Sequence, residues 1–319
     1  MNILNINKLY SGGVIVNYYC SSKCKHCVYC SSPNWEKDYI QSEMSEKICD
    51  KLLSLGCNSV HIGGGEPMLN LDGLYNFLNI AKKKSMGIDY IETNGSWYKS
   101  LEETKKIFDK LFELNVNTIM ISVSPYHTEY IPMYKVDGVE EACKKFGMNY
   151  FIYQQQFRSE LSVYDKTKTH KFDELGENYF KSIPNRYGLS MKGRALSEYK
   201  KYMKKISYEK FLNDSSCREL AGVNHFHVDL YGNYVPNCPG ISINLDDIGI
   251  NIDEKQYILI EKLFSNGIKS AYEYAKTFGF IADDEYVSKC DFCYEIRKFL
   301  ISKELNINEL QPIGHYNFM

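Results

Sequence analysis

The stretch GVIVNYYCSSKCKHCVYC, residues 13–30, decides the fold because a mostly apolar run leads straight into closely spaced cysteines. Residues 13–19 are β-branched, apolar and aromatic, which predicts a strand that ends at the first cysteine. Cys20, Cys24, Cys27 and Cys30 follow within eleven positions. Three thiolates at this spacing can wrap one cubic iron–sulfur cluster and leave one iron open. All four would equally suit a structural zinc site.

Outward from this stretch, segments that predict strands alternate with segments that predict helices. The predicted strands cover 13–19, 58–62, 89–93, 118–124, 149–153 and 187–191, and the predicted helices cover 42–56, 74–84, 102–115, 138–147 and 172–183. This alternation predicts a parallel sheet built from βα units, either doubly wound or curved into a whole or partial barrel. In both architectures functional residues gather at the C-terminal ends of the strands.

The pattern changes near residue 205. Residues 225–235 predict two short strands around a Tyr-Gly-Asn turn, and residues 261–279 predict a helix. A Cys-x2-Cys pair at 290–293 leads into another predicted helix. We therefore expect two domains, 1–204 and 205–319.

Composition limits the classes of partner. The chain has 319 residues, 44% hydrophobic and 24% charged, with a net charge of −2, which gives no reason to expect nucleic acid or an acidic membrane. No apolar run is long enough to span a membrane, so a cytoplasmic location is expected. Eleven cysteines in a reducing compartment indicate metal binding or catalysis rather than disulfides. Cys49, Cys57 and Cys143, which lie singly in or beside helical patterns, are expected to be small buried side chains.

GGGEP, residues 63–67, follows the second predicted strand. Consecutive glycines allow close approach to the backbone, and Glu66 can accept a hydrogen bond from an ammonium group. With CSSKCKHC at 20–27 and GGEP at 64–67 in this order, the chain resembles the radical S-adenosylmethionine (SAM) superfamily.

The resemblance implies a partial (β/α)6 barrel of the TIM type, with a [4Fe-4S] cluster on Cys20, Cys24 and Cys27. SAM would bind the open iron, with Gly64, Gly65 and Glu66 beside it. Its reductive cleavage in this family yields methionine and a 5′-deoxyadenosyl radical that abstracts a substrate hydrogen. The paired motifs favour this cluster over the zinc alternative.

Weaker matches extend the expected SAM site to other strand ends. The candidates are Asn94 in ETNG, Ser122 and Ser124 in SVSPYH, Gln154 in YQQQF, and Arg194 in KGRA. Arg194 would hold the SAM carboxylate in a bidentate pair. Relatives often carry Asp where Ser124 stands, which leaves the ribose contact open.

Cys217, Cys238, Cys290 and Cys293 form a second group. Their pattern resembles the auxiliary-cluster domains called SPASM and twitch, and four cysteines imply one auxiliary [4Fe-4S] cluster. Asn237 stands at the usual ligand position and Cys238 comes one residue late. Cys238 is therefore either a ligand or a free thiol, and a structural zinc site is the alternative to a cluster.

The resemblance implies an enzyme whose substrate is a ribosomally made peptide that it epimerises, cross-links or closes by a thioether. Cys238 and Cys30 are candidate hydrogen donors for epimerisation. The alternative enzyme is a small-molecule dehydrogenase whose auxiliary cluster accepts an electron. The alternative outside enzymes is a zinc- or cluster-stabilised binding protein.

His225 and His227 alternate on a predicted strand, so both face one side and are candidates for binding metal or substrate. An external electron donor such as flavodoxin or ferredoxin is expected. Because the first barrel strand begins at residue 13, a peptide leader would have to bind the barrel mouth or a separate protein.

Overall fold

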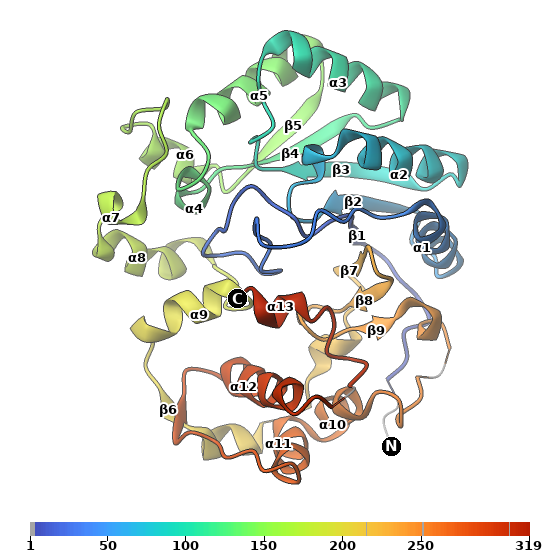
Figure 1. Ribbon diagram of the computed structural model, residues 1–319, viewed down its shortest axis with the longest axis vertical. Helices are drawn as coiled ribbons and strands as arrows, with labels where there is room; N and C mark the ends of the chain where they lie inside the picture. Colours follow the sequence, from blue (N-terminus) through green and yellow to red (C-terminus); the bar gives the residue numbers. More distant parts are fainter. Residues whose placement is uncertain (1–3, 215, 251, 306) are drawn as a thin grey trace.

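In the computed structural model, which describes residues 4–214, 216–250, 252–305 and 307–319, one eight-stranded sheet organises the chain (Figure 1). Its strand order is β5-β4-β3-β2-β1-β7-β8-β9. The bounds are β1 (Gly12–Ile15), β2 (Ser59–Gly63), β3 (Gly87–Thr93), β4 (Thr118–Ser122), β5 (Asn149–Tyr153), β7 (Phe226–Asp229), β8 (Asn233–Val235) and β9 (Ile243–Asn244). Strands β1 to β5 and β7 pair in parallel, and β8 and β9 are antiparallel. Strands β6 (Ile206–Ser207) and β10 (Glu285–Tyr286) form a separate pair.

Helices follow the strands in the βα order that the sequence predicts. In the first part of the chain they are α1 (Ser42–Ser54), α2 (Leu71–Lys83), α3 (Leu101–Glu113), α4 (Pro125–Thr128), α5 (Met133–Phe146), α6 (Gln156–Leu161), α7 (Phe172–Leu175), α8 (Glu177–Tyr187) and α9 (Arg194–Tyr199). In the second part they are α10 (Ile258–Asn266), α11 (Ile268–Lys276), α12 (Lys289–Ser302) and α13 (Gly314–Asn317). Short 3-10 turns include η1 (Pro67–Leu69), η4 (Arg218–Ala221) and η5 (Leu245–Asp247). Among the described residues no helix is both long and apolar enough to cross a membrane.

The predicted α/β class with a partial, open TIM-type barrel is confirmed, but the sixth strand is not the predicted one. Residues 188–191 are not paired in a sheet, because Tyr187 belongs to the last turn of α8 and Gly188 ends that helix with a φ of 58°. The sixth parallel strand is β7, and β1 lies between β2 and β7 in the sheet. The sheet therefore crosses residue 205, and the division into 1–204 and 205–319 remains a prediction.

Two predicted helices are each divided by a glycine. The segment 172–183 breaks at Gly176 (φ 83°, ψ 148°) between α7 and α8. The segment 261–279 breaks at Gly267 (φ 73°, ψ −166°) between α10 and α11. Both backbone conformations are outside the helical region and are accessible to glycine without a steric penalty.

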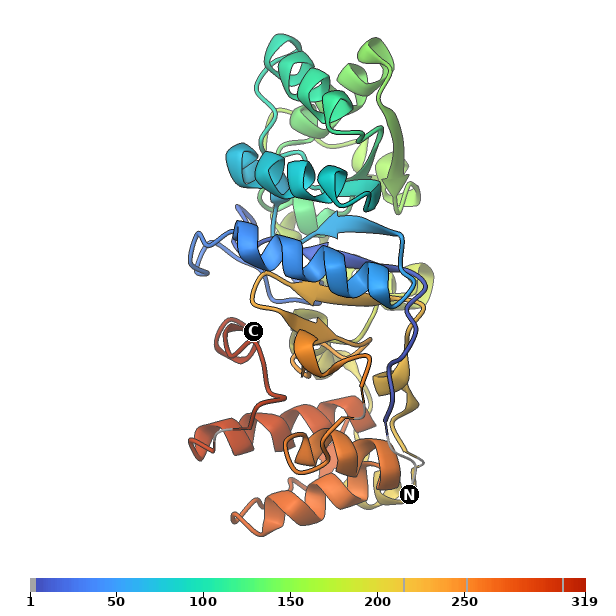
Figure 2. The same ribbon diagram turned by 90° about the vertical axis from the view of Figure 1, so that its right-hand side faces the viewer.

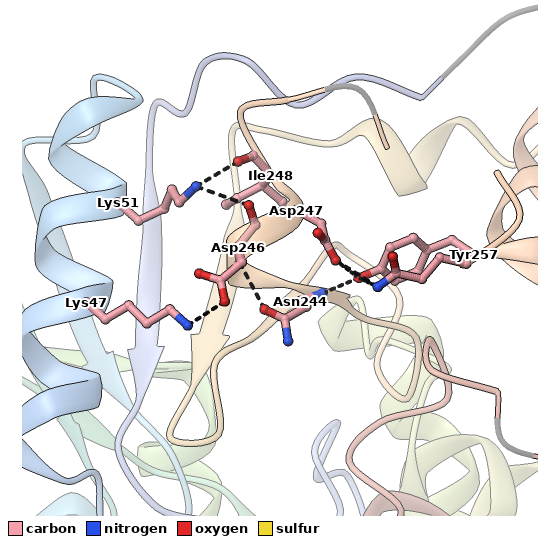
Figure 3. Close-up of polar contacts among 8 residues, drawn as sticks. Lys47, Lys51, Asn244, Asp246, Asp247, Ile248 and Tyr257 are labelled. Carbon is pink, nitrogen blue, oxygen red and sulfur yellow. Dashed lines mark hydrogen bonds and ion pairs between the residues drawn. The ribbon is translucent and has the colours of Figure 1, made fainter. Parts of the chain in front are cut away.

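The second part of the chain contacts helix α1 of the first part. Helices α10 to α12 gather at the end of the molecule away from α3 and α5 (Figures 1 and 2). Beside them, Lys47 and Lys51 on α1 reach to η5, where Lys47 Nζ lies 2.6 Å from Asp246 Oδ2 and Lys51 Nζ donates to the Ile248 carbonyl at 3.0 Å (Figure 3). The Tyr257 hydroxyl holds the same turn through Asp247 Oδ2 at 2.5 Å. These contacts hold the C-terminal segment along the edge of the barrel.

Successive side chains of each strand point to opposite faces of the sheet, and here one face is apolar and the other is partly polar. Val14, Ile62, Ile91 and Ile121 are fully buried in the hydrophobic core. Their neighbours in sequence, such as Gly13, His61 and Glu92, face the opposite side. Three single cysteines are buried core side chains, as predicted: Cys49, Cys57 and Cys143. The polar side of the sheet is where the candidate site lies.

Candidate active site

A cavity of about 440 Å³ lies at the C-terminal ends of the parallel strands. Eight residues expected to bind the cluster or SAM line it: Cys20, Cys24, Cys27, Gly64, Gly65, Asn94, Ser122 and Gln154. They come from the loop after β1 and from the ends of β2, β3, β4 and β5. We refer to this cavity as the barrel cavity.

The three cysteines of the loop after β1 share this cavity and influence each other electrostatically. Burial raises the pKa of Cys20 to about 12 and raises the pKa of Cys24 well above its usual value, and the neighbouring thiolates add to both shifts. Asn94 Nδ2 donates to Cys20 Sγ at 3.4 Å. Such thiols ionise only when a cationic partner compensates them, which is what the irons of a cluster supply.

No group of three or more His, Cys, Asp or Glu side chains in the described residues is arranged to hold a single metal ion. A cubic cluster spreads its thiolate ligands over separate irons and therefore places them farther apart than one ion does. The three thiols of this loop, which line one cavity, fit the spread-out donor set of a cluster.

The glycines of GGGEP serve a packing role that the sequence did not predict. A Cβ on Gly65 would lie 2.0 Å from the Tyr19 carbonyl oxygen, and one on Gly64 would lie 2.5 Å from that of Asn17. Gly65 N donates to the Asn17 carbonyl at 2.8 Å, and Glu66 N donates to that of Tyr19 at 3.1 Å. The close neighbour is thus the chain entering the cysteine loop, which fixes that loop against β2.

Glu66 is fully buried and does not line the barrel cavity. Its carboxylate accepts hydrogen bonds from Asn94 N (2.7 Å), Thr93 Oγ1 (2.9 Å) and Met68 N (3.1 Å). Burial raises its pKa to about 7, although these three donors favour the ionised form. The structure therefore places Glu66 as a positioning residue that connects GGGEP to the end of β3.

Arg194 does not reach the cavity, contrary to its expected role as a SAM carboxylate ligand. Its guanidinium is buried and donates to the carbonyls of Cys24 (2.7 Å), Ser31 (3.1 Å) and Phe318 (3.2 Å). Gly193, with a φ of 54°, packs against the Cys27 and Val28 carbonyls, where a Cβ would clash. The KGRA segment thus supports the cysteine loop from behind.

Two further expected site residues lie away from the cavity. Cys30 is fully buried, lines neither of the cavities described here, and has a pKa raised by burial to about 12. Its position does not suit a hydrogen donor to substrate. Ser124 is buried at the start of α4, where its hydroxyl lies 2.7 Å from His127 Nδ1. It does not line the cavity, and its expected part in the SAM site remains a prediction.

His26 provides a test of whether SAM fits. Its ring stacks on Tyr126 with centroids 4.4 Å apart, and it lines the cavity. Its Nδ1 is buried and has no hydrogen-bond partner among the described residues. An unpartnered buried polar atom beside the cysteine loop fits a cofactor with hydrogen-bonding groups, as SAM has.

Sequence reasoning missed an acid–base cluster on the inner face of the sheet. Gly13 pairs with His61 on β2 and with His227 on β7, so both imidazoles meet above a residue without a side chain. A Cβ on Gly13 would lie 2.3 Å from His61 Nε2. The two Nε2 atoms are 2.9 Å apart, and the Tyr29 hydroxyl lies 2.7 Å from His227 Nδ1.

The Tyr29 hydroxyl and the two rings form one chain of hydrogen bonds. Burial lowers the pKa of His61 to about 4 and lowers that of His227 well below its usual range, so both rings are neutral at neutral pH. His61 also hydrogen-bonds the backbone of Gly12. One Nε2 therefore donates to the other, and which ring donates depends on the tautomers of the two histidines.

Glu92 lies beside this cluster and lines the cavity. Its carboxylate lies over Gly63, where a Cβ would be 3.0 Å from Oε2. The nearest basic group among the described residues is His61 Nε2, at 3.7 Å. Burial and the charge of Glu66 raise the pKa of Glu92 to about 7. The available signal was the period of two in β3, which places Tyr90 and Glu92 on the same face of the strand.

The second cysteine group surrounds a separate cavity of about 280 Å³, here called the auxiliary cavity. All four cysteines, Cys217, Cys238, Cys290 and Cys293, line it. Cys290 and Cys293 lie in the first turn of α12, whose N-cap Ser288 accepts from Asp291 N at 3.1 Å. Burial raises the pKa of Cys217 to about 11 and that of Cys293 to about 12, with contributions from Cys238 and Cys290. The donor set fits an auxiliary cluster.

Cys238 and its neighbours separate the two cavities. Asn237 lines the barrel cavity, Cys238 lines the auxiliary cavity and Pro239 lines both. Lys192 Nζ donates to the Asn237 carbonyl at 2.5 Å and holds this loop. The one-residue delay of Cys238 in the sequence therefore places Asn237 toward the barrel and the thiol toward the other three cysteines.

Comparison with known families identifies the class. Residues 14–152 match the model of the radical SAM superfamily. This match covers less than half of the chain, and the members of that superfamily use a [4Fe-4S] cluster and SAM. The GTP 3′,8-cyclase of Rhizobium etli (strain CIAT 652) is 26% identical over 109 residues, which cover 32% of this chain and 30% of that protein. The match thus spans less than a third of that relative's length.

Three solved structures are similar to this chain at low sequence identity. BtrN in complex with AdoMet and 2-DOIA is 18% identical with a TM-score of 0.41, covering 72% of this chain and 74% of that one. Native anSMEcpe with bound AdoMet is 16% identical with a TM-score of 0.46, covering 93% and 98%. Streptococcus suis SuiB bound to S-adenosylmethionine is 18% identical with a TM-score of 0.41, covering 74% and 61%.

Proposed function

We propose that this protein is a radical SAM oxidoreductase that oxidises its substrate by two electrons. The barrel cavity is the proposed reaction site. The proposed electron acceptor is a cluster held by the cysteines of the auxiliary cavity. The observation that carries the proposal is that Cys217, Cys238, Cys290 and Cys293 all line one cavity, separate from the barrel cavity. A cluster with four cysteine ligands has no open iron for substrate and is suited to electron transfer.

The cysteines expected to hold the two clusters are Cys20, Cys24 and Cys27 in the barrel and the four cysteines of the auxiliary cavity. With SAM bound, the barrel cluster supplies the hydrogen-abstracting chemistry of the superfamily. A substrate H–C–OH group that has lost one hydrogen atom becomes a carbonyl by losing one further proton and one electron. The loop 236–239, whose residues line one cavity or the other and whose Pro239 lines both, is the proposed path for that electron.

The proton acceptor is the inner-face histidine cluster. His225 and His227 line the barrel cavity, and His227 is held by Tyr29 and His61. The proposed proton acceptor is the His225 imidazole, which lines the cavity beside His227 with ring centroids 5.1 Å apart. The role proposed for the two histidines is therefore proton transfer rather than metal binding.

Epimerisation is less well supported than oxidation. It requires a group that returns a hydrogen atom to the substrate, and both cysteine candidates, Cys238 and Cys30, lie outside the barrel cavity. Among the described residues, the cysteines that line this cavity are the three proposed cluster ligands.

A nucleotide substrate such as the GTP named for the Rhizobium etli relative is also poorly supported. Among the described residues no lysine or arginine lines the barrel cavity, so a triphosphate would find no side-chain cation there.

Oxidative modification of a peptide is the second candidate, and one observation favours it. Strand β5 is an edge of the sheet and exposes Phe151 (42%) and Tyr153 (50%). An extended peptide can pair with such an edge, with its side chains against exposed aromatics. A thioether or cross-link formed there would also require loss of two electrons.

The test uses anaerobically purified protein, SAM and either dithionite or reduced flavodoxin. Two clusters predict about eight irons per chain, one cluster about four, and a zinc-stabilised binding protein none. Cys290→Ala should lower the count to about four, retain 5′-deoxyadenosine formation and abolish substrate oxidation. If Cys290→Ala oxidises substrate as fast as the wild type, the proposed electron acceptor is wrong.

A further inference from the structure

The barrel cavity has one carboxylate and no side-chain cation. Glu92 is the acidic residue that lines it, and among the described residues neither lysine nor arginine does. Four histidines line it, His26, His127, His225 and His227, and burial lowers the pKa of His26, His127 and His227, as it does that of the adjacent His61. Among the described residues, no lysine or arginine of this cavity is a counter-ion for the carboxylate.

The two carboxylates at this end of the barrel differ in how they are satisfied. The buried Glu66 accepts three hydrogen bonds from the chain, whereas no hydrogen bond from the described residues reaches the half-buried Glu92 carboxylate. The nearest basic group among the described residues, His61 Nε2, lies 3.7 Å from Glu92 Oε1 and 2.9 Å from His227 Nε2. A carboxylate that faces a cavity without a partner is stabilised by a bound cation.

Aromatic side chains complete this part of the cavity. Tyr29, Tyr90 and Tyr153 line it with Glu92, and Tyr90 stacks on His61 with centroids 5.1 Å apart. Tyrosine faces attract ammonium groups, so carboxylate and rings favour the same ligand. Gly63, below Glu92, leaves room for the carboxylate to lie along the sheet.

We propose that Glu92 binds a positively charged amino group of the substrate, so that the oxidised carbon belongs to an amino-bearing compound. This inference rests on the proposed function for the reaction but concerns recognition, and its test needs no turnover. The same ammonium chemistry is offered by a small amino alcohol and by a lysine side chain of a peptide.

The experiment measures binding to the cluster-loaded protein with SAM and without reductant. The small-molecule arm compares trans-4-aminocyclohexanol with cyclohexane-1,4-diol, and the peptide arm compares N-acetyl-lysinamide with its Nε-acetylated form, by anaerobic isothermal titration. We expect a preference of about tenfold or more for the amine in one arm, because an ion-paired hydrogen bond contributes that much. The arm that shows it identifies the source.

Variants test whether Glu92 causes the preference. Glu92→Gln should remove it, Glu92→Asp should retain part of it, and Glu102→Gln on the exposed side of α3 should leave it unchanged. Equal binding of both members in both pairs overturns the inference, as does a preference that survives Glu92→Gln. If Glu92→Gln weakens SAM binding as much as amine binding, Glu92 serves SAM and the inference is also overturned.

The preference should depend on pH. With the pKa of Glu92 raised to about 7, the ionised form that pairs with an amine becomes populated as pH rises from 6 to 8. The groups that face it are His61 on β2, Tyr90 on β3, Tyr29 and the buried Glu66. The two histidines of the cluster stay neutral over this range, and the amines stay protonated because alkylamines have pKa values of about 10. A preference that is flat from pH 6 to 8 contradicts the assignment to Glu92.

Discussion

At the scale of single residues, Arg194 shows how a position can support a cofactor site without touching the cofactor. Its guanidinium joins the cysteine loop, through the carbonyls of Cys24 and Ser31, to the C-terminal Phe318. The resemblance predicted that Arg194 binds the SAM carboxylate, whereas in the structure its two terminal nitrogens donate to three carbonyls of the chain.

Arg194→Met should therefore destabilise the protein by about 3 kcal/mol, because it leaves buried carbonyls without donors. The free energy of unfolding in urea and the iron content both measure the effect, and we expect the barrel irons to be lost first. Arg186→Met on α8, whose side chain is 39% exposed, is the matched control and should cost less than about 1 kcal/mol. If both substitutions lower the free energy of unfolding and the iron content equally, Arg194 does not stabilise the cysteine loop.

At the scale of elements, the row His61–Gly13–His227 depends on three neighbouring strands. Gly13→Ala should displace both imidazoles and cost about 1–3 kcal/mol through overpacking. Substrate oxidation should fall more than 5′-deoxyadenosine formation, because the histidines act on the substrate and not on SAM. His61→Ala in the Gly13→Ala background should recover stability but not oxidation, as a double-mutant cycle would show. If the double-mutant cycle shows no coupling energy between the two substitutions, the added methyl group does not act by displacing His61.

Much of the fold was predictable because helices and strands here follow simple hydrophobic periods. Strands β2 to β5 and the hairpin of β7 and β8 lie where the hydrophobic pattern predicts them, whereas β1 ends at Ile15 and is shorter than the predicted strand 13–19. Residues 187–191 were predicted to form a strand because apolar Leu189 and Met191 are two positions apart. In the structure β5 pairs with β4 and not with this segment. The acid–base cluster was missed because it depends on register: nothing local in His61, Gly13 or His227 shows that they lie side by side.

At the scale of the whole molecule, the C-terminal tail contacts both proposed cluster sites. His315 lines the auxiliary cavity and hydrogen-bonds the backbone of Tyr29 in the cysteine loop. The Tyr316 hydroxyl accepts from Arg297 Nη1 at 2.9 Å and donates to the Gly240 carbonyl. His315 thus contacts the cysteine loop, whereas Tyr316 contacts residues beside the auxiliary cavity.

Tyr316→Phe should lower the stability of the auxiliary site by about 1–3 kcal/mol, because it leaves the buried Arg297 with one donor unsatisfied. Electron paramagnetic resonance of the reduced protein should show the auxiliary signal weakened, with the barrel signal nearly unchanged. Tyr10→Phe, at a side chain that is 57% exposed, is the control. Loss of the barrel signal alone would contradict this distribution of roles.

The reach of Arg194 to Phe318 also has a consequence for biosynthesis. The cysteine loop follows the first strand of the sheet, and one of the carbonyls that orient its supporting guanidinium comes from Phe318, at the C-cap of α13. During translation the loop emerges long before that support exists. We expect iron delivery to the barrel to follow the synthesis of α13, so that nascent chains stalled before residue 314 carry little cluster even when iron–sulfur assembly proteins are abundant.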